Sequence, residues 1–369
     1  MPELMISADS HVVEPLTLWT ERCDARFRER VPRLVREVAG RKGSFVVCED
    51  ALPTPLSAFC SAGFSPEELA RAFAADEPAV RAGGFEPGAR LADMARDGVA
   101  AEILYPSVAL QAFRVRDAAL QAECFRVYND WLAAFCAAAP ERLFGVALIS
   151  LFDVAAATRE LERAVALGLR GAMVWAAPPL GDSYARPEYD PFWRAAAAAA
   201  TPVSLHLGTT QDLTAPGESI AVAFMMTILP VQRALSQLLL GGVLERHPAL
   251  RVVSVENEIG WLPHFLARLD HGAAKYREVA GLELTHAPSE IFRRQVGATF
   301  QEDRIGIEAR DRIGIESILW ASDYPHSDST WPNSRAVIAR DLADVPPAER
   351  TKILAGNVAR VYKITLPTS

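Results

Sequence analysis

Aspartate and histidine side chains follow three short apolar runs of the sequence, in a pattern that is typical of metal sites. The first run ends in ADSH, and because successive side chains of a strand point to opposite faces, Asp9 and His11 point the same way. His206 lies in SLHLG and Asp323 in WASDYPH. Imidazole and carboxylate ligands without a nearby cysteine suit Zn²⁺, Fe²⁺ or Mn²⁺. Each residue alone could instead cap a turn or be a hydrogen-bonded core residue, so the prediction rests on all three runs together.

These runs belong to a longer alternation of strand-length apolar segments with segments of helical period, which predicts a parallel sheet with crossover helices. The candidate strands are Leu4 to Asp9, Val99 to Tyr105, Leu143 to Leu151, Leu169 to Trp175, Pro202 to Leu207, Leu250 to Glu256, Val296 to Gln301 and Ser317 to Asp323. Eight such strands indicate an α/β protein with a (β/α)8 TIM barrel, in which catalytic groups sit at the carboxyl ends of the strands. We expect residues 1–369 to form one barrel domain.

The segment from Trp19 to Gly88 interrupts this alternation after the first strand. It contains prolines, turns and short helical pieces such as Pro66 to Ala75. A loop that follows a barrel strand emerges at the catalytic mouth, so residues 19–88 are predicted to be an inserted lid.

Composition narrows the partners to small molecules. The net charge is -8 and no Lys/Arg run occurs, which argues against nucleic-acid binding. The most apolar stretch, Ile220 to Val231, is too short for a membrane helix and is expected to be a buried helix. The five cysteines have no CxxC spacing and the first residues lack a signal-peptide pattern, so we expect reduced thiols and a cytoplasmic protein. Four lysines against abundant alanine and arginine are typical of GC-rich bacterial genomes.

Several segments together resemble the amidohydrolase superfamily, in its amidohydrolase-2 branch of aminocarboxymuconate semialdehyde and resorcylate-type decarboxylases. The segments are ADSHVVEP, LADMARDGVAAEILYPS, ERLFGVALIS, RVVSVENEIGWLP, LWASDYPHSDSTWP and GNVARVYKI. The resemblance implies that Asp9, His11, His206 and Asp323 are metal ligands. It also implies metal-dependent hydrolysis or non-oxidative decarboxylation, with one or two divalent ions per chain, and a homodimer.

The chain departs from this family in two places. The fourth strand reads LRGAMVWAAP, without the carboxylated lysine that bridges two ions in many members. Glu256 is the first candidate for a bridging carboxylate, followed by Glu14 and Glu102. Glu256 also stands where family decarboxylases carry a proton-handling histidine on the sixth strand. The alternative is a structural carboxylate paired with Arg251 or Arg293.

Because that histidine is missing, we expect a metal-dependent hydrolase that cleaves an amide, ester or thioester of a small or medium organic acid. A metal-activated water would attack the carbonyl, Asp323 would accept its proton, and Glu256 would bind metal or assist as base. His326 could orient Asp323 or donate a proton, or merely cap its turn. The alternative is a metal-dependent decarboxylase of an aromatic or unsaturated carboxylate. A non-catalytic scaffold is a third reading, which the four intact candidate ligands disfavour.

Overall fold

Eight parallel strands form the centre of the computed structural model, which describes residues 3–49, 51–74, 80–210, 222 and 225–366. Their order in the sheet follows the chain: β1 (Ile6–His11), β5 (Ala101–Tyr105), β6 (Leu143–Leu148), β7 (Gly171–Val174), β8 (Val203–His206), β9 (Val252–Val255), β10 (Val296–Phe300) and β11 (Ile318–Trp320). Every residue in these strands is buried, which explains why they read as continuous apolar runs. The predicted (β/α)8 barrel is confirmed, with all eight strands inside or overlapping their predicted ranges.

The ring is joined between its first and last strands by backbone hydrogen bonds. The amide of Asp323, just past β11, donates to the carbonyl of Asp9 at 2.9 Å. The amide of His11 donates to the carbonyl of Tyr324 at 2.6 Å. The pairing of β1 with β5 shifts register between Ser7 and Ser10, which marks a bulge next to Asp9. Bulges of this kind re-aim the side chains beside them.

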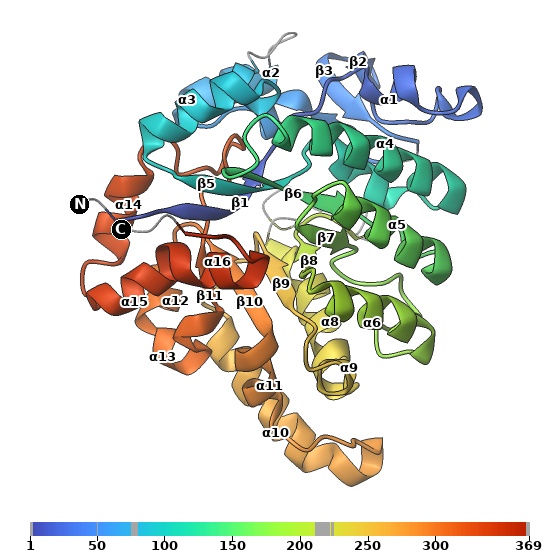
Figure 1. Ribbon diagram of the computed structural model, residues 1–369. Coiled ribbons are helices and arrows are strands. Elements are labelled where there is room, and N and C mark those ends of the chain that lie inside the picture. The colour runs from blue at the N-terminus through green and yellow to red at the C-terminus, as the bar shows by residue number, and fades with distance from the viewer. Residues whose placement is uncertain (1–2, 50, 75–79, 211–221, 223–224, 367–369) are drawn as a thin grey trace.

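Helices surround the strands, as Figure 1 shows. They are α3 (Pro87–Asp97), α4 (Ala118–Cys136), α5 (Val154–Ala166), α6 (Asp190–Ala199), α8 (Ile228–Leu240), α9 (Val243–Arg246), α10 (Leu262–Ala280), α11 (Pro288–Gln295), α12 (Arg304–Glu308), α13 (Arg310–Ile313), α14 (Ser334–Asp341), α15 (Pro347–Thr351) and α16 (Asn357–Tyr362). Shorter helical turns are η4 (Val108–Arg114), η5 (Pro187–Tyr189), η6 (Ile315–Ser317) and η7 (Lys352–Gly356). Helix α10 projects from the body of the molecule, at the bottom of Figure 1.

The insertion after β1 contains a three-stranded antiparallel sheet, which the sequence analysis did not anticipate. Its elements are α1 (Leu18–Arg22), η1 (Ala25–Phe27), β2 (Arg33–Val38), β3 (Arg41–Val47), β4 (Thr54–Pro55), η2 (Leu56–Phe59), α2 (Pro66–Ala74) and η3 (Ala82–Gly84). The segment contacts the loop after β11. The amide of Ala62 donates to the carbonyl of Pro325 at 3.1 Å, and the amide of Ser327 donates to the carbonyl of Ala58 at 3.4 Å. Residues 50 and 75–79 of the predicted lid lie outside the described residues.

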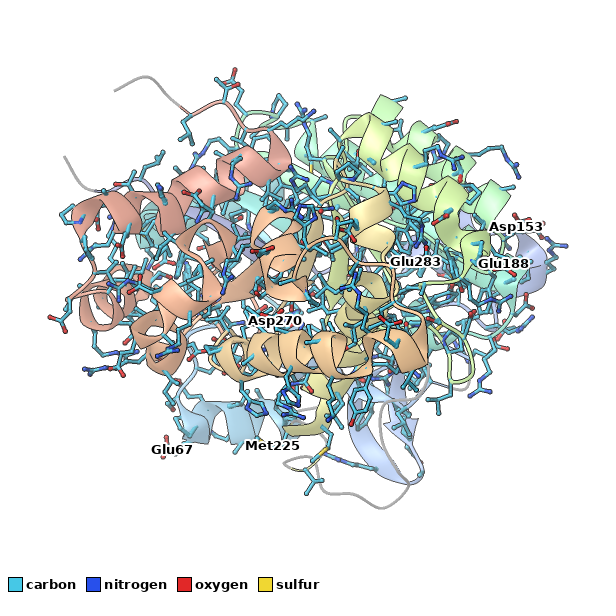
Figure 2. All side chains as sticks on the ribbon, turned by 90° about the horizontal axis from the view of Figure 1, so that it is seen from below. Glu67, Asp153, Glu188, Met225, Asp270 and Glu283 are labelled. Atoms are coloured by element: carbon cyan, nitrogen blue, oxygen red, sulfur yellow. The ribbon has the colours of Figure 1, made fainter. Side chains whose placement is uncertain are left out.

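The expected buried helix over Ile220 to Val231 differs from the structure. Ile220 lies outside the described residues, and α8 begins only at Ile228. Met225 is 67% exposed, and Figure 2 shows its side chain pointing away from the body. The described residues at the start of this apolar run therefore lie on the surface, and the run reaches the buried core only at Val231. Among the helices of the described part, none has the length and apolarity to cross a bilayer.

Candidate metal centre

Six side chains singled out in the sequence meet at the carboxyl ends of four strands. They come from β1, from the end of β8, and from the residues just after β9 and β11, and they are Asp9, His11, His206, Glu256, Asp323 and His326. They form two overlapping groups of four, and within each group one potential ligand atom per residue lies within 4.8 Å of all the others. The first group is Asp9, His11, His206 and Glu256, and the second is His11, Glu256, Asp323 and His326.

Two histidines present the same ring nitrogen to this cluster. The Nδ1 of His11 donates to the carbonyl of Pro106 at 2.6 Å, and the Nδ1 of His206 donates to the carbonyl of Leu207 at 2.8 Å. A carbonyl oxygen can only accept, so these bonds place the Nδ1 proton and leave Nε2 to face the cluster. The two Nε2 atoms are 3.3 Å apart. This orientation is the one that metal-binding histidines adopt.

The carboxylates of Asp9 and Asp323 are fully buried, and none of their four oxygens has a hydrogen-bond partner among the described residues. The Nε2 of His11 lies 3.3 Å from one oxygen of each, at ion-pair distance. Burial by itself raises the pKa of Asp9, but His11 and His206 outweigh it and lower that pKa. Burial likewise lowers the pKa of His11, and Asp323 and Asp9 reverse this and raise it. These carboxylates therefore attract positive charge to the place where the ring nitrogens converge.

Glu256 follows β9 and points toward the same centre, with its Oε2 3.5 Å from the Nε2 of His206. Its φ is 59°, in the left-handed region, where a non-glycine residue costs about 1–3 kcal/mol and is typical of functional sites. Asp323 has the same feature, with φ 55°. Burial, together with the negative charges of Asp323 and Asp9, raises the pKa of Glu256 well above its ordinary value. This carboxyl therefore retains a proton more readily than its neighbours.

The structural alternative for Glu256 is not what the structure shows. Arg251 donates to the carbonyls of Pro248 and Leu250. Arg293 donates to Ser289 and to the carbonyl of Arg312, so neither arginine pairs with Glu256.

His326 stacks on His11, with ring centroids 3.7 Å apart. Its Nδ1 lies 3.1 Å from Asp323, and its Nε2 is 2.9 Å from the hydroxyl of Ser107. His326 therefore links the carboxylate after β11 to the loop after β5. The sequence analysis missed Ser107, whose signal was its position directly after the second strand, in ILYPS.

Glu14 and Glu102, the other candidate bridging carboxylates, bind elsewhere. Glu14 accepts the backbone N–H groups of Ser107, Val108 and Ala109 at 2.8–3.2 Å, and so holds the start of η4. Glu102 forms a buried ion pair with Arg90 at 2.6 Å. These two fallback candidates therefore lie outside the cluster of potential ligands, with backbone amides and a guanidinium as their partners.

The cluster fits a divalent cation. Buried carboxylate oxygens without donors and imidazole nitrogens held in the ligating orientation are the groups that Zn²⁺, Fe²⁺ and Mn²⁺ bind. A divalent metal site is therefore supported, and the identity of the ion is a matter for proposal.

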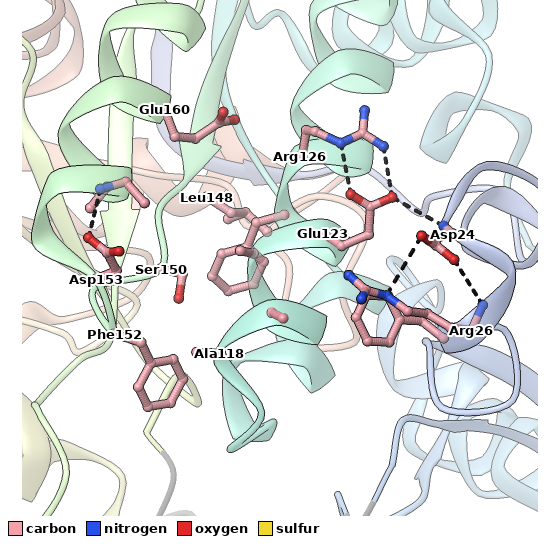
Figure 3. A pocket seen from close by; sticks show the side chains of 16 residues that line it. Asp24, Arg26, Ala118, Glu123, Arg126, Leu148, Ser150, Phe152, Asp153 and Glu160 are labelled. Atoms are coloured by element: carbon pink, nitrogen blue, oxygen red, sulfur yellow. Dashed lines mark hydrogen bonds and ion pairs between the residues drawn. The ribbon is translucent and has the colours of Figure 1, made fainter.

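A separate pocket of about 360 Å³ opens between α4, the start of α5 and the insertion (Figure 3). Its charged side chains already have protein partners. Glu123 pairs with Arg126 at 2.9 Å, Asp24 lies 3.7 Å from Arg26, and Asp153 caps α5. None of the cluster residues lines this pocket, so it does not compete with the strand ends as the candidate centre.

Known proteins place the chain in a family. The amidohydrolase family model, Amidohydro_2, matches residues 19–364. The chain belongs to the amidohydrolase family. A gamma-resorcylate decarboxylase from Rhizobium radiobacter is 29% identical over 278 residues, which cover 69% of this chain and 80% of the relative. A gamma-resorcylate decarboxylase from Polaromonas sp. is 27% identical over 351 residues, which cover 86% and 98%.

Solved structures share the fold of this amidohydrolase. The 5-carboxyvanillate decarboxylase from Sphingomonas paucimobilis aligns with a TM-score of 0.69 and 24% identity, over 99% of this chain and 100% of that one. A dihydroxybenzoic acid decarboxylase from Polaromonas sp., solved with bound manganese and the inhibitor 2-nitroresorcinol, aligns with a TM-score of 0.67 and 19% identity, over 98% and 97%.

These relatives overturn the expected hydrolysis of an amide, ester or thioester. The matched relatives and these structural neighbours are decarboxylases of aromatic acids, which agrees with the alternative. The missing sixth-strand histidine does not decide against decarboxylation, because a glutamate in its place can also carry a proton.

Proposed function

We propose that this amidohydrolase is a metal-dependent, non-oxidative decarboxylase of hydroxylated aromatic acids. The observation that carries the proposal is the cluster of unpartnered carboxylates and oriented imidazoles at the barrel mouth, in a chain whose matched relatives are gamma-resorcylate decarboxylases. The substrate class follows from those relatives and from the neighbours that act on 5-carboxyvanillate and dihydroxybenzoic acid.

Asp9, His11, His206 and Asp323 would hold the divalent ion: the first three belong to one group of converging ligand atoms, and Asp323 joins His11 in the other. Mn²⁺ is the ion we favour because a structural neighbour carries it. Such an ion would bind the substrate carboxylate with its neighbouring hydroxyl and stabilise the negative charge on them. Although burial opposes it, His326 and His11 lower the pKa of Asp323, so this residue is ionised as a ligand must be.

Glu256 supplies the proton in this proposal. Decarboxylation replaces the C–C bond to the carboxylate by a C–H bond: the ring carbon receives a proton, the C–C bond electrons return to the ring, and CO₂ leaves. Glu256 is the carboxyl of the cluster whose pKa is raised. It stands where the family resemblance implies a proton-handling histidine. It would donate to the ring carbon and recover its proton from water.

His326 is a positioning residue in this scheme. It contacts Asp323 on one side and Ser107 on the other, and it stacks on His11. Because these three contacts fix the His326 ring, the ring keeps the Asp323 carboxylate oriented toward the candidate metal centre.

We also propose that the insertion over residues 19–88 covers the bound substrate. In support, the ring of Phe59 lies 5.8 Å from that of His326, and the carbonyl of Gly84 accepts the amide of Val13 at 2.8 Å. Ligand should then slow proteolytic cleavage within the insertion, and unchanged cleavage rates at saturating ligand would contradict this.

The activity can be tested on manganese-loaded protein with 2,6-dihydroxybenzoate and 5-carboxyvanillate. We expect CO₂ release and, in D₂O, deuterium at the vacated ring carbon of the product. Asp323→Asn is the control, because it removes one ligand charge from the cluster with little change in shape. If folded, metal-replete protein released no CO₂ from any hydroxybenzoate, the proposal would be wrong.

A further inference from the structure

Arg90 of α3 is a fully buried arginine that binds the backbone carrying two of the candidate ligands. Each of its three side-chain nitrogens donates a hydrogen bond. The Nε donates to Glu102 at 2.6 Å, one terminal nitrogen donates to the carbonyl of His11 at 2.6 Å, and the other donates to the carbonyl of Tyr324 at 3.4 Å. His11 is itself a candidate ligand, and Tyr324 directly follows Asp323. One side chain therefore binds both sides of the junction between the first and last strands.

His11 is fixed at its main chain as well as at its ring. Its amide donates to the carbonyl of Tyr324 at 2.6 Å, its carbonyl accepts from Arg90, and its Nδ1 donates to the carbonyl of Pro106. Because all three groups are bonded, the Nε2 that faces the cluster has little freedom to move. Hydrogen-bond partners that orient a histidine in this way tune its affinity for a metal ion.

Tyr324 restrains the backbone of the other ligand, Asp323. The guanidinium carbon of Arg90 lies 4.6 Å from the centroid of the Tyr324 ring, and the Tyr324 hydroxyl donates to Asp93, one turn further along α3. The preceding residue, Asp323, has a left-handed φ of 55°, a conformation that persists only where the surroundings enforce it. Contacts at the carbonyl, ring and hydroxyl of the next residue provide that restraint.

The same guanidinium reaches the end of the insertion. The nitrogen that binds His11 also donates to the carbonyl of Gly83, in η3, at 3.4 Å. A Cβ atom at Gly83 would collide with the side chains of Asp93 and Tyr324, so glycine is required for this close approach. The last turn of the insertion is therefore held by the contacts that also hold the ligand-bearing backbone.

We propose that Arg90 is a positioning residue, which sets the spacing of His11 and Asp323 for the metal ion and joins it to the end of the insertion. Arg90 acts through backbone carbonyls and contacts neither the ion nor the substrate. The inference rests on the metal-binding part of the proposed function and holds for any substrate acid. A guanidinium suits this role because its planar donors serve several acceptors at once, whereas a lysine ammonium is a compact point charge.

Asp97 provides a matched control for a purely structural role. It lies on the same helix, is 3% exposed, and accepts the backbone N–H of Ser334 at 2.9 Å. Arg90 and Asp97 are thus both buried polar contacts between α3 and the segment after β11, but Ser334 lies well beyond the candidate ligands in the chain. Substitutions at both sites should destabilise the fold, and only those at Arg90 should alter the metal centre.

Manganese binding, measured by calorimetry, separates the two roles. Arg90→Lys keeps a positive charge beside Glu102 and loses the planar set of donors, so it should weaken manganese binding about 10- to 100-fold. The double variant Arg90→Gln/Glu102→Gln, which leaves no buried charge of the pair behind, should show the same loss. Asp97→Asn should bind manganese as the natural chain does. The Tm of each metal-free protein is measured in parallel and shows that the variants fold.

Hydrogen exchange of the metal-free protein tests the same contact without an ion. In Arg90→Lys the amide of His11, which donates to Tyr324, should exchange faster, while the amide of Ile149 at the junction of β6 and β7 should not. Asp97→Asn should leave the His11 amide as protected as in the natural chain.

Two results would overturn the proposal: equal losses of manganese affinity in Arg90→Lys and Asp97→Asn, or unchanged affinity in both Arg90 variants. A natural chain that bound no manganese would reject the metal centre and, with it, this role of Arg90. Failure of the decarboxylase reaction is distinct: manganese binding that depends on Arg90, without CO₂ release from any hydroxybenzoate, would reject the reaction and retain the role of Arg90.

Discussion

At the scale of single residues, the cluster shifts the pKa values of chemically similar groups in opposite directions. Burial acts alike on Asp9, Glu256 and Asp323, but the two aspartates lie within 3.3 Å of His11, whereas Glu256 faces their negative charges. The pKa of each aspartate is therefore lowered and that of Glu256 raised. Groups whose environments separate their pKa values are suited to separate roles, here ligand and acid.

Glu256 is the residue where this division can be tested. Glu256→Gln keeps the shape of the side chain and cannot donate an acidic proton, so kcat should fall by about 100-fold or more. Glu256→His, which introduces the histidine that the family resemblance implies at this position, should recover part of that loss. Turnover and bound manganese are measured on the same samples.

Full metal content with low turnover in Glu256→Gln would agree with the acid role. Loss of about one ion per chain would instead make Glu256 a ligand, and unchanged turnover would leave it without a role in the reaction. Glu283→Gln, an exposed substitution on the connection after α10, is the matched control and should keep both quantities unchanged.

At the scale of elements, the barrel strands were predictable because each is buried on both faces and so reads as an unbroken apolar run. The sheet of the insertion was not. Strand β2 has no buried residue, and β3 is buried only over its middle. Because both strands are partly exposed, their sequences RLVREV and RKGSFVV contain charged residues, and they look like surface loops. Short, half-exposed strands give no clear period of two.

Connections between elements also carry stability, as Glu245 of α9 illustrates. Its carboxylate accepts the hydroxyl of Thr285 and the backbone N–H groups of Thr285 and His286, the latter two at 3.0–3.1 Å, and lies 2.7 Å from the His286 ring. Although burial opposes them, these bonds lower its pKa from 4.5 to about 2. A lowered folded-state pKa stabilises the protein above pH 4.5, and this contribution disappears as the pH falls toward 2.

Glu245→Gln should therefore reduce the free energy of unfolding at pH 7 by about 1–2 kcal/mol, a value discounted for the partly solvated side chain. The deficit relative to the natural chain should shrink between pH 4.5 and pH 3 in urea unfolding. Glu283→Gln serves as the control again, since Glu283 is exposed two residues before Thr285. A deficit that stayed constant with pH would contradict the assignment.

At the scale of the whole molecule, the site residues that lie at the ends of barrel strands could be predicted from the sequence. The contacts that side chains make with one another could not. Asp9, His11, His206 and Asp323 could be found because a barrel brings the carboxyl ends of its strands together. The contact between Ser107 and His326 could not be predicted, because it exists only in three dimensions. The homodimer implied by the family resemblance stays a prediction.

The metal centre also spans the seam at which the barrel closes. The candidate ligands come from β1, β8 and the turn after β11, and the first and last of these are joined by the backbone bonds of His11 and Asp323. A cation bound there would neutralise the carboxylates and link the two ends of the sheet. Binding to the folded state alone adds about 4 kcal/mol at a thousandfold excess over Kd.

Removing metal with a chelator should therefore lower Tm by about 5 °C or more, since each kcal/mol is worth roughly 2 °C in a large domain. Hydrogen exchange should show which part of the barrel is destabilised. The amides of His11 and Asp323 should lose protection first, because repulsion between the carboxylates opens the seam between the first and last strands. The amide of Ile149, which donates to Met173 at the junction of β6 and β7, is the internal control and should stay protected. Returning Mn²⁺ should restore Tm and the seam together. Equal loss of protection at all three amides would mean that the ion stabilises the barrel as a whole, and an unchanged Tm would mean that the cluster binds no metal.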